Sequence, residues 1–94
     1  MTRIKVKEII FDEWNIKHIK KHRVSAEEVI EAGTNVIYHK RTYKKRYLAV
    51  GRSGNRLISF VIKRKSTKRY YLVSARDAAK KERSEVYEKE KQKK

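Results

Sequence analysis

The chain has 94 residues, which is enough for a single domain (residues 1–94) with one modest core. It carries 27 Lys and Arg against 11 Asp and Glu, and the resulting net charge of +16 predicts a polyanionic partner. The chain has no Cys, which excludes disulfides and thiolate metal sites, and no apolar run reaches the roughly 18 residues of a membrane span, so we expect a cytoplasmic protein without a membrane partner.

The first third of the chain predicts one strand followed by two helices. Apolar and charged residues alternate over residues 4–11, as in a strand with one solvated face. Asn15 is the expected N-cap of a short helix that runs to about residue 22. The run Ser25-Ala26-Glu27-Glu28 is a capping box, because the Ser oxygen and the Glu carboxylate can each accept a free backbone N–H. It begins a second helix, which Gly33 is expected to end.

After Gly33 the pattern changes to β-branched and aromatic runs of strand length. Residues 53–55 (Ser-Gly-Asn) predict a tight hairpin, and residues 63–68 predict a second, strongly basic turn. Connections this short favour an antiparallel meander, since parallel strands need crossovers of a dozen or more residues. The predicted strands cover residues 36–38, 47–51, 57–62 and 69–74.

The C-terminal segment predicts a final helix, because residues 78–90 are rich in Ala, Lys, Glu and Arg. Asp77 is its expected N-cap. The expected element order is therefore β-α-α-β-β-β-β-α. This order predicts an α+β fold in which two N-terminal helices and one C-terminal helix pack on an antiparallel sheet.

The predicted sheet is also the basic part of the molecule. From Ala32 through Arg76 there are thirteen Lys and Arg and no acidic residue. Tyrosines interleave with these cations and suit either stacking on the bases of single-stranded RNA or ordinary packing between strands. The tyrosines that interleave with the cations are Tyr38, Tyr43, Tyr47, Tyr70 and Tyr71. Trp14, in the first third of the chain, is expected to be a core anchor.

Glu82 breaks the pattern of the last helix. It lies four residues from both Ala78 and Val86, so its carboxylate is expected to face the sheet. A carboxylate in that position needs a cationic partner, for which Arg64 and Arg76 are the candidates. Two interpretations remain open: a general base beside guanidiniums that bind phosphate, or a structural ion pair between helix and sheet.

Two histidines stand four residues apart on the first helix. His18 and His22 have the spacing of half a zinc site, but the chain has only one other His and no Cys, so neither a metal nor another cofactor is expected. His22 is a candidate for proton transfer because an imidazole titrates near neutral pH. The alternative is a solvated or packed side chain.

Cleavage of RNA without a metal requires a base for the 2′-hydroxyl, cations for the phosphoryl oxygens and an acid for the leaving oxygen. His22 and Glu82 are the candidates for base and acid, Arg64 and Arg76 are cations that flank strands, and Tyr87 can donate a proton or stack on a base. Further candidates for RNA contact are Lys21, Arg52, Lys63, Lys65, Arg69 and Arg83. A non-catalytic basic protein that binds RNA or DNA is the alternative function.

The sequence resembles the BrnT family of type II toxin–antitoxin toxins in motifs spread from residue 11 to residue 87. The resemblance implies a RelE-like fold, a metal-independent ribonuclease that inhibits translation, and a cognate antitoxin with a DNA-binding domain, with which the toxin forms a complex. It also implies catalytic roles for His22, Arg64, Arg76 and Glu82. The family usually has Gly after the histidine, where this chain has Arg23 and so lacks glycine's freedom at positive φ. The motifs that carry the resemblance are Glu13-Trp14, Lys21-His22-Arg23-Val24-Ser25-Ala26-Glu27-Glu28, Val50-Gly51-Arg52, Ser74-Ala75-Arg76, Glu82-Arg83 and Tyr87.

Overall fold

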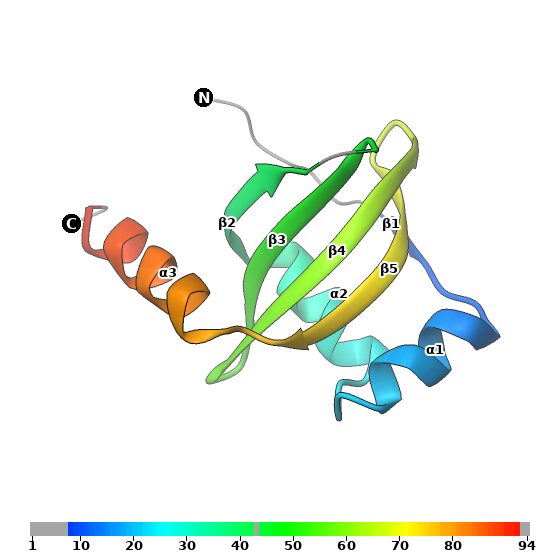
Figure 1. Cartoon of the computed structure of the whole chain (residues 1–94), viewed down its shortest axis with the longest axis horizontal. Helices are drawn as coiled ribbons and strands as arrows, with labels where there is room; N and C mark the ends of the chain where they lie inside the picture. The colour runs from blue at the N-terminus through cyan, green and yellow to red at the C-terminus, as the bar shows by residue number, and fades with distance from the viewer. Residues whose placement is uncertain (1–7, 43, 93–94) are drawn as a thin grey trace.

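The protein is described here by a computed structural model that covers residues 8–42 and 44–92 (Figure 1). The described part has five strands and three helices in the predicted order, which confirms the α+β fold class. The predicted strand residues 4–7 and Tyr43 lie outside the described residues. The elements are β1 (Glu8–Ile10), α1 (Glu13–Lys20), α2 (Ala26–Thr34), β2 (Val36–Arg41), β3 (Arg46–Ser53), β4 (Arg56–Ser66), β5 (Arg69–Asp77) and α3 (Lys80–Gln92).

The five strands form one sheet in the order β1-β5-β4-β3-β2. Strands β2 to β5 pair antiparallel, as their short connections predicted. Strand β1, however, pairs parallel with β5, so the sheet is mixed and the prediction of a purely antiparallel sheet is wrong. The reason is that two helices and three strands separate β1 from β5 along the chain, and this is ample length for a parallel connection.

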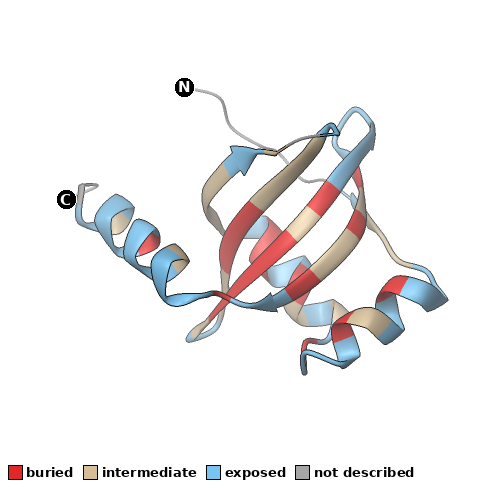
Figure 2. Cartoon of the chain, viewed as in Figure 1, coloured by how far each residue is buried: buried red, intermediate tan, exposed pale blue. Residues whose placement is uncertain are grey.

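Helices α1 and α2 cover one face of the sheet and leave most of the other face open (Figure 1). Side chains alternate along β4, so Phe60 and Ile62 point toward the helices, while Ser59, Val61 and Lys63 point to the open face. Figure 2 shows the buried residues concentrated in β3, β4 and β5 and on the helices behind them. The largest members of this core are Phe60, Ile19, Ile58, Ile62, Leu72 and Val29.

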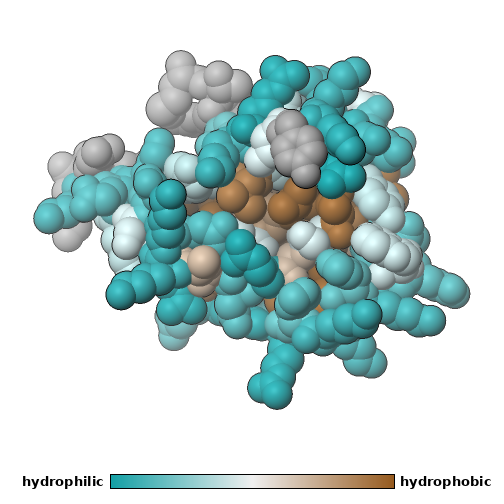
Figure 3. All heavy atoms as spheres, viewed as in Figure 1, coloured by the Kyte–Doolittle hydropathy of each residue, from teal (hydrophilic) through white to brown (hydrophobic). Residues whose placement is uncertain are grey.

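Helix α3 covers only one end of the open face. Val86 is fully buried there against Val50, Leu57 and Ala78, which form a second, smaller core. The middle of the open face stays accessible, and Figure 3 shows hydrophobic residues there surrounded by hydrophilic ones. This face therefore exposes apolar side chains in the middle of a sheet whose sequence is strongly basic.

The start of α1 differs from the prediction. The N-cap is Asp12, whose carboxylate accepts the Asn15 N–H at 2.8 Å. Asn15 is three residues later and completes the capping box, because its side-chain oxygen accepts the Asp12 N–H at 2.9 Å. Its amide nitrogen donates to the carbonyl oxygens of Ile10 at 3.0 Å and Leu72 at 3.1 Å. Asn15 is thus a buried tie between α1, β1 and β5.

Trp14 is not a core residue, because 58% of it is exposed. Asn15 and Ile19 are the buried residues of α1, and Trp14 projects from the other side of the helix. The capping box at Ser25 and Glu28 is confirmed, with hydrogen bonds of 3.2 Å and 3.0 Å. Helix α2 continues one residue past Gly33 and ends at Thr34.

Two boundaries near the C-terminus also differ from the prediction. Strand β4 continues to Ser66, so residues 63–66 are strand and only Thr67 and Lys68 form the turn. Asp77 is the last residue of β5 and binds Arg56, so it does not cap the last helix. Helix α3 begins at Lys80 instead, and the carboxylate of Glu82 accepts the Ala79 N–H at 2.7 Å.

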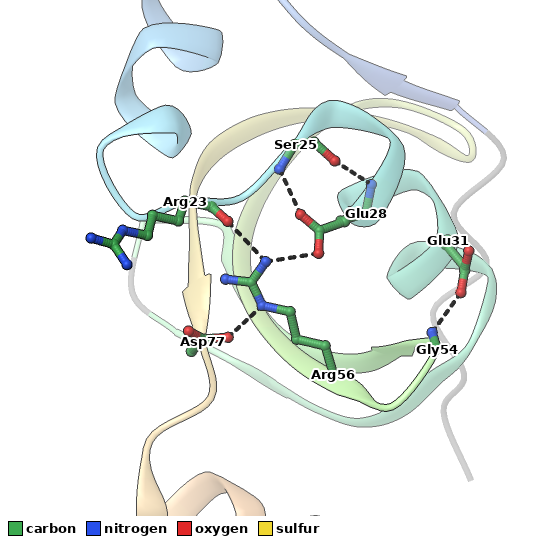
Figure 4. A network of polar contacts seen from close by, with 7 residues as sticks. All are labelled: Arg23, Ser25, Glu28, Glu31, Gly54, Arg56 and Asp77. Atoms are coloured by element: carbon green, nitrogen blue, oxygen red, sulfur yellow. Dashed lines mark hydrogen bonds and ion pairs between the residues drawn. The ribbon is translucent and has the colours of Figure 1, made fainter.

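Arg56, at the start of β4, joins three elements (Figure 4). Its Nε donates to Asp77 at 2.6 Å, and its Nη1 donates to Glu28 at 2.7 Å and to the Arg23 carbonyl at 2.8 Å. Arg23 has a φ of 58°, so this arginine adopts the left-handed conformation that glycine favours. The turn between α1 and α2 is thereby fixed to the end of β5.

Candidate active site

The pairing of β4 with β5 places Ser59 opposite Arg76 on the open face of the sheet. The first turn of α3 brings Glu82 to the same place. Arg76 donates to Glu82 through Nη1 at 3.1 Å and Nη2 at 3.2 Å, which is a bidentate ion pair. Ser59, only 2% exposed, donates its hydroxyl to Glu82 Oε2 at 3.1 Å. Three elements thus converge on one carboxylate.

The Glu82 side chain is only 14% exposed, whereas that of Arg76 is 46% exposed. Burial raises the pKa of Glu82, but hydrogen bonds from Ala79 N–H and Arg76, together with the charge of Arg76, outweigh burial and lower the pKa overall. The carboxylate is therefore ionised at neutral pH. Its four acceptor positions are all occupied, by Ala79 N–H, two Arg76 nitrogens and Ser59 Oγ.

The sequence predicted that Glu82 faces the sheet and that its partner is Arg64 or Arg76, and the structure shows that the partner is Arg76. Ser59 was missed. The available signal was alternation along β4, because residues 58, 60 and 62 are large apolar residues and a serine between them must lie on the opposite face.

Arg64 does not join this group. It has the same parity along β4 as Phe60 and Ile62, so it projects on the helix side of the sheet, opposite to Ser59 and Glu82. It lines a separate cleft of about 410 Å³ with Arg41, Lys45, Tyr47, Lys65, Ser66 and Thr67. The prediction that Arg64 could be the partner of Glu82 is wrong for this geometrical reason.

His22 lies in the exposed turn that follows α1. Its ring makes an edge contact with His18, at 5.7 Å between ring centroids. Among the described residues, no hydrogen bond or ion pair joins His22 to Arg76 or Glu82. The adjacent Arg23 carbonyl accepts from Arg56, which also binds Asp77, so the His22 turn lies at the end of the sheet where β5 leads into α3.

The remaining predicted RNA contacts are scattered. Lys63 lies on the open face and is exposed, and Lys21 is exposed beside His22. Arg83 and Tyr87 line a cleft of about 390 Å³ with Asn55, Arg56 and Leu57. Three others are engaged elsewhere: Arg52 pairs with Glu90 at 2.9 Å, Arg69 pairs with Glu8 at 3.0 Å, and Lys65 lies 5.8 Å from the Tyr71 ring.

Within residues 8–42 and 44–92, no three His, Cys, Asp or Glu side chains come close enough together to hold a metal ion. His18 and His22 contact each other through their rings and have no third ligand in this part of the chain. Among the described helices, none combines the length and the apolar composition that crossing a membrane requires.

The sequence matches no family model and no curated protein. Among solved structures, the chain is similar to BrnT, a ribonuclease toxin of Brucella abortus whose crystal structure was determined at 1.1 Å resolution. The match has a TM-score of 0.64 and covers 78% of this chain and 97% of BrnT. The chain has the BrnT fold. Since the two sequences are 24% identical, the match establishes the shared fold, which the sequence resemblance had implied.

Proposed function

We propose that the protein is a ribonuclease toxin of a type II toxin–antitoxin system, which cleaves RNA without a metal in the cytoplasm and so inhibits translation. The observation that carries the proposal is the half-buried ion pair of Glu82 and Arg76 on the open face of a sheet with the BrnT fold. The excess of cations on the sheet supports RNA as the substrate, because RNA presents one negative charge per nucleotide. The charge of +16 also suits an acidic antitoxin, which we expect to carry a DNA-binding domain.

The occupied acceptor positions of Glu82 define how the reaction would begin. Glu82 has no free lone pair for the 2′-hydroxyl while Arg76 holds it. The exposed Arg76 guanidinium can turn to a phosphate, which accepts the same bidentate pair of hydrogen bonds. Loss of Arg76 removes a cause that lowers the pKa of Glu82, while burial, which raises it, remains. Substrate binding would thus turn an ion pair into a general base.

The released carboxylate takes the proton of the 2′-hydroxyl, and the 2′-oxygen attacks the phosphorus. The bond from phosphorus to the 5′-oxygen then breaks, which yields a 2′,3′-cyclic phosphate and a 5′-hydroxyl. Arg76 stabilises the charge that develops on the phosphoryl oxygens. His22 is our candidate for the acid that protonates the 5′-oxygen, because its turn is fixed to the end of β5 through Arg23 and Arg56.

A second candidate function is a non-catalytic protein that binds nucleic acid. The observation that favours it is the same full set of hydrogen bonds to Glu82, since a carboxylate that stays saturated serves only to hold α3 on the sheet. The two functions predict different effects when the Glu82 carboxylate is replaced by the neutral amide of glutamine. In a binder, Glu82→Gln affects stability alone, whereas in a nuclease it removes the base.

The test compares purified wild type with Glu82→Gln and, as the matched control, Glu85→Gln, which changes an exposed glutamate one turn away on α3. RNA cleavage is measured with and without EDTA, and affinity is measured on an uncleavable 2′-deoxy oligonucleotide. We expect Glu82→Gln to lower the cleavage rate by about 10²- to 10⁴-fold with affinity unchanged. Glu85→Gln and EDTA should have little effect. Equal cleavage by wild type and folded Glu82→Gln would refute the catalytic role.

A further inference from the structure

Three aromatic rings form a row along the exposed side of α1 and the turn after it. The Trp14 and His18 rings are stacked, with centroids 5.1 Å apart and planes at 7°. The His18 and His22 rings meet edge to face at 5.7 Å. Trp14 is 58% exposed, so the largest side chain of the described residues lies mostly in solvent. One face of the indole is covered by His18, and the other is free to stack.

Two cations accompany the rings. Lys17 and Lys21 are three and seven residues after Trp14, so helical spacing places all three on the same side of the helix, and both lysines are exposed. Asp12 and Glu13 precede Trp14, which places negative charge at the start of the helix and positive charge at its end. A polyanion on this surface is therefore directed toward the lysines.

The helix that carries Trp14 and His18 is fixed at both ends. The capping box between Asp12 and Asn15 fixes the first turn of α1, and the buried Asn15 amide binds carbonyls of both flanking strands. Ile19, 1% exposed, anchors the other end of α1 in the core. A platform that is already ordered loses little conformational entropy when a ligand stacks on it.

The row also ends at the end of β5 that carries the candidate active site, on the helix side of the sheet. His22 is followed by Arg23, whose carbonyl accepts from Arg56, and Arg56 binds Asp77 (Figure 4). Asp77 directly follows Arg76, which donates to the Asp77 carbonyl at 3.0 Å as well as to Glu82. A strand that lies along α1 from Trp14 to His22 therefore reaches the end of the sheet at which Arg76 and Glu82 lie on the opposite face.

We propose that this exposed side of α1 binds unpaired bases of single-stranded nucleic acid. One base stacks on the free face of Trp14, and Lys17 and Lys21 bind the adjoining phosphates. The inference rests on the proposed function in that it names the form of the substrate, an unpaired strand. Stacking on an aromatic side chain is tolerant of base identity, so this surface contributes affinity and alignment without selecting a sequence.

The chain has a single tryptophan, so its fluorescence reports on Trp14 alone. The protein is titrated with a single-stranded deoxythymidine oligonucleotide and with an abasic oligonucleotide of equal length and charge; neither has the 2′-hydroxyl needed for cleavage. We expect the thymidine strand to quench the fluorescence and the abasic strand to leave it nearly unchanged. Trp14→Ala has no tryptophan, so its binding is followed by the anisotropy of a labelled strand; it should bind the thymidine strand about tenfold more weakly and the abasic strand as tightly as wild type does.

The matched control is Ile30→Ala, which removes an exposed apolar side chain (50% exposed) from α2 and should not change either affinity. Equal quenching by both strands would show binding by charge alone and overturn the proposal. Stronger quenching by poly-glutamate than by the thymidine strand would assign the surface to an acidic protein and also overturn it. The wild-type titration, compared with the wild-type RNA cleavage assay, separates the two proposals: quenching by the thymidine strand without cleavage of RNA removes the nuclease alone, and cleavage of RNA without quenching removes this surface alone.

Discussion

Replacement of Arg56 by methionine tests how the fold positions the candidate active site. Methionine keeps most of the apolar stem but removes the charge and three hydrogen bonds, to Asp77, Glu28 and the Arg23 carbonyl. A hydrogen bond to a charged group contributes about 1.5–3 kcal/mol when buried. The side chains of Arg56, Glu28 and Asp77 are 28%, 29% and 53% exposed, so solvent screening reduces this considerably.

We therefore expect Arg56→Met to lower the free energy of unfolding by about 2 kcal/mol at pH 7 and the melting temperature by about 10 °C. The pKa of Glu28 is lowered by the Ser25 backbone N–H and by Arg56, and the pKa of Asp77 is lowered mainly by Arg56. Groups with a lowered pKa in the folded state stabilise the fold above their unfolded pKa, and this contribution is lost as pH falls through the folded value. The difference between wild type and variant should therefore shrink as pH falls from 5 to 3.

Thermal unfolding followed by circular dichroism at pH 7, 5 and 3 measures the effect. Arg69→Met is the control, because its single ion pair with Glu8 has both side chains more than half exposed. Arg69→Met should lower the free energy of unfolding by less than about 0.5 kcal/mol. A loss in Arg56→Met that is as large at pH 3 as at pH 7, or a loss no larger than that of Arg69→Met, would refute the reasoning.

Two further substitutions test the backbone. Gly51→Ala should lower the free energy of unfolding by about 2–3 kcal/mol, because a Cβ at this position would overlap the Ala32 carbonyl oxygen of α2, and chemical denaturation of the variant beside wild type measures the loss. An unchanged denaturation midpoint would show that α2 moves away at no cost. Arg23→Gly should raise the free energy of unfolding by up to about 1 kcal/mol, because glycine relieves the positive φ while the Arg23 carbonyl that binds Arg56 is retained. A drop in the melting temperature would mean that the Arg23 side chain stabilises the turn by more than this strain.

The sequence was sufficient to predict those structural features that depend only on residues close together in the chain. The capping box at Ser25 and the hairpin at Gly54, whose φ is 60°, are local and were predicted in place. Asp12 and Asn15 illustrate the limit of such reasoning: both residue types cap helices, and each satisfies the other's backbone N–H, so composition alone did not decide which one begins α1. The parallel pairing of β1 depends on contacts across the whole chain and has no local signal.

The part of the candidate site that lies on helix α3 was predicted from the sequence, whereas the part that lies on the sheet was not. Glu82 shares the buried side of α3 with Val86, which its spacing indicated. The alternation along β4 already placed Arg64 on the side of Phe60 and Ser59 on the opposite side, but only the structure shows that Glu82 lies on the side of Ser59. Trp14 was predicted to be buried because of its size, but the inward positions of α1 are occupied by Asn15 and Ile19.

Strand β2 is at the end of the strand order, so among the described strands its outer backbone groups meet no neighbour. Exposed edges of this kind recruit strands from other molecules and begin aggregation. Here the edge ends in exposed Lys40 and Arg41, and a second copy that docked there would bring four cations together. The positive charge that suits the sheet to a phosphate backbone thus also discourages the molecule from polymerising with itself.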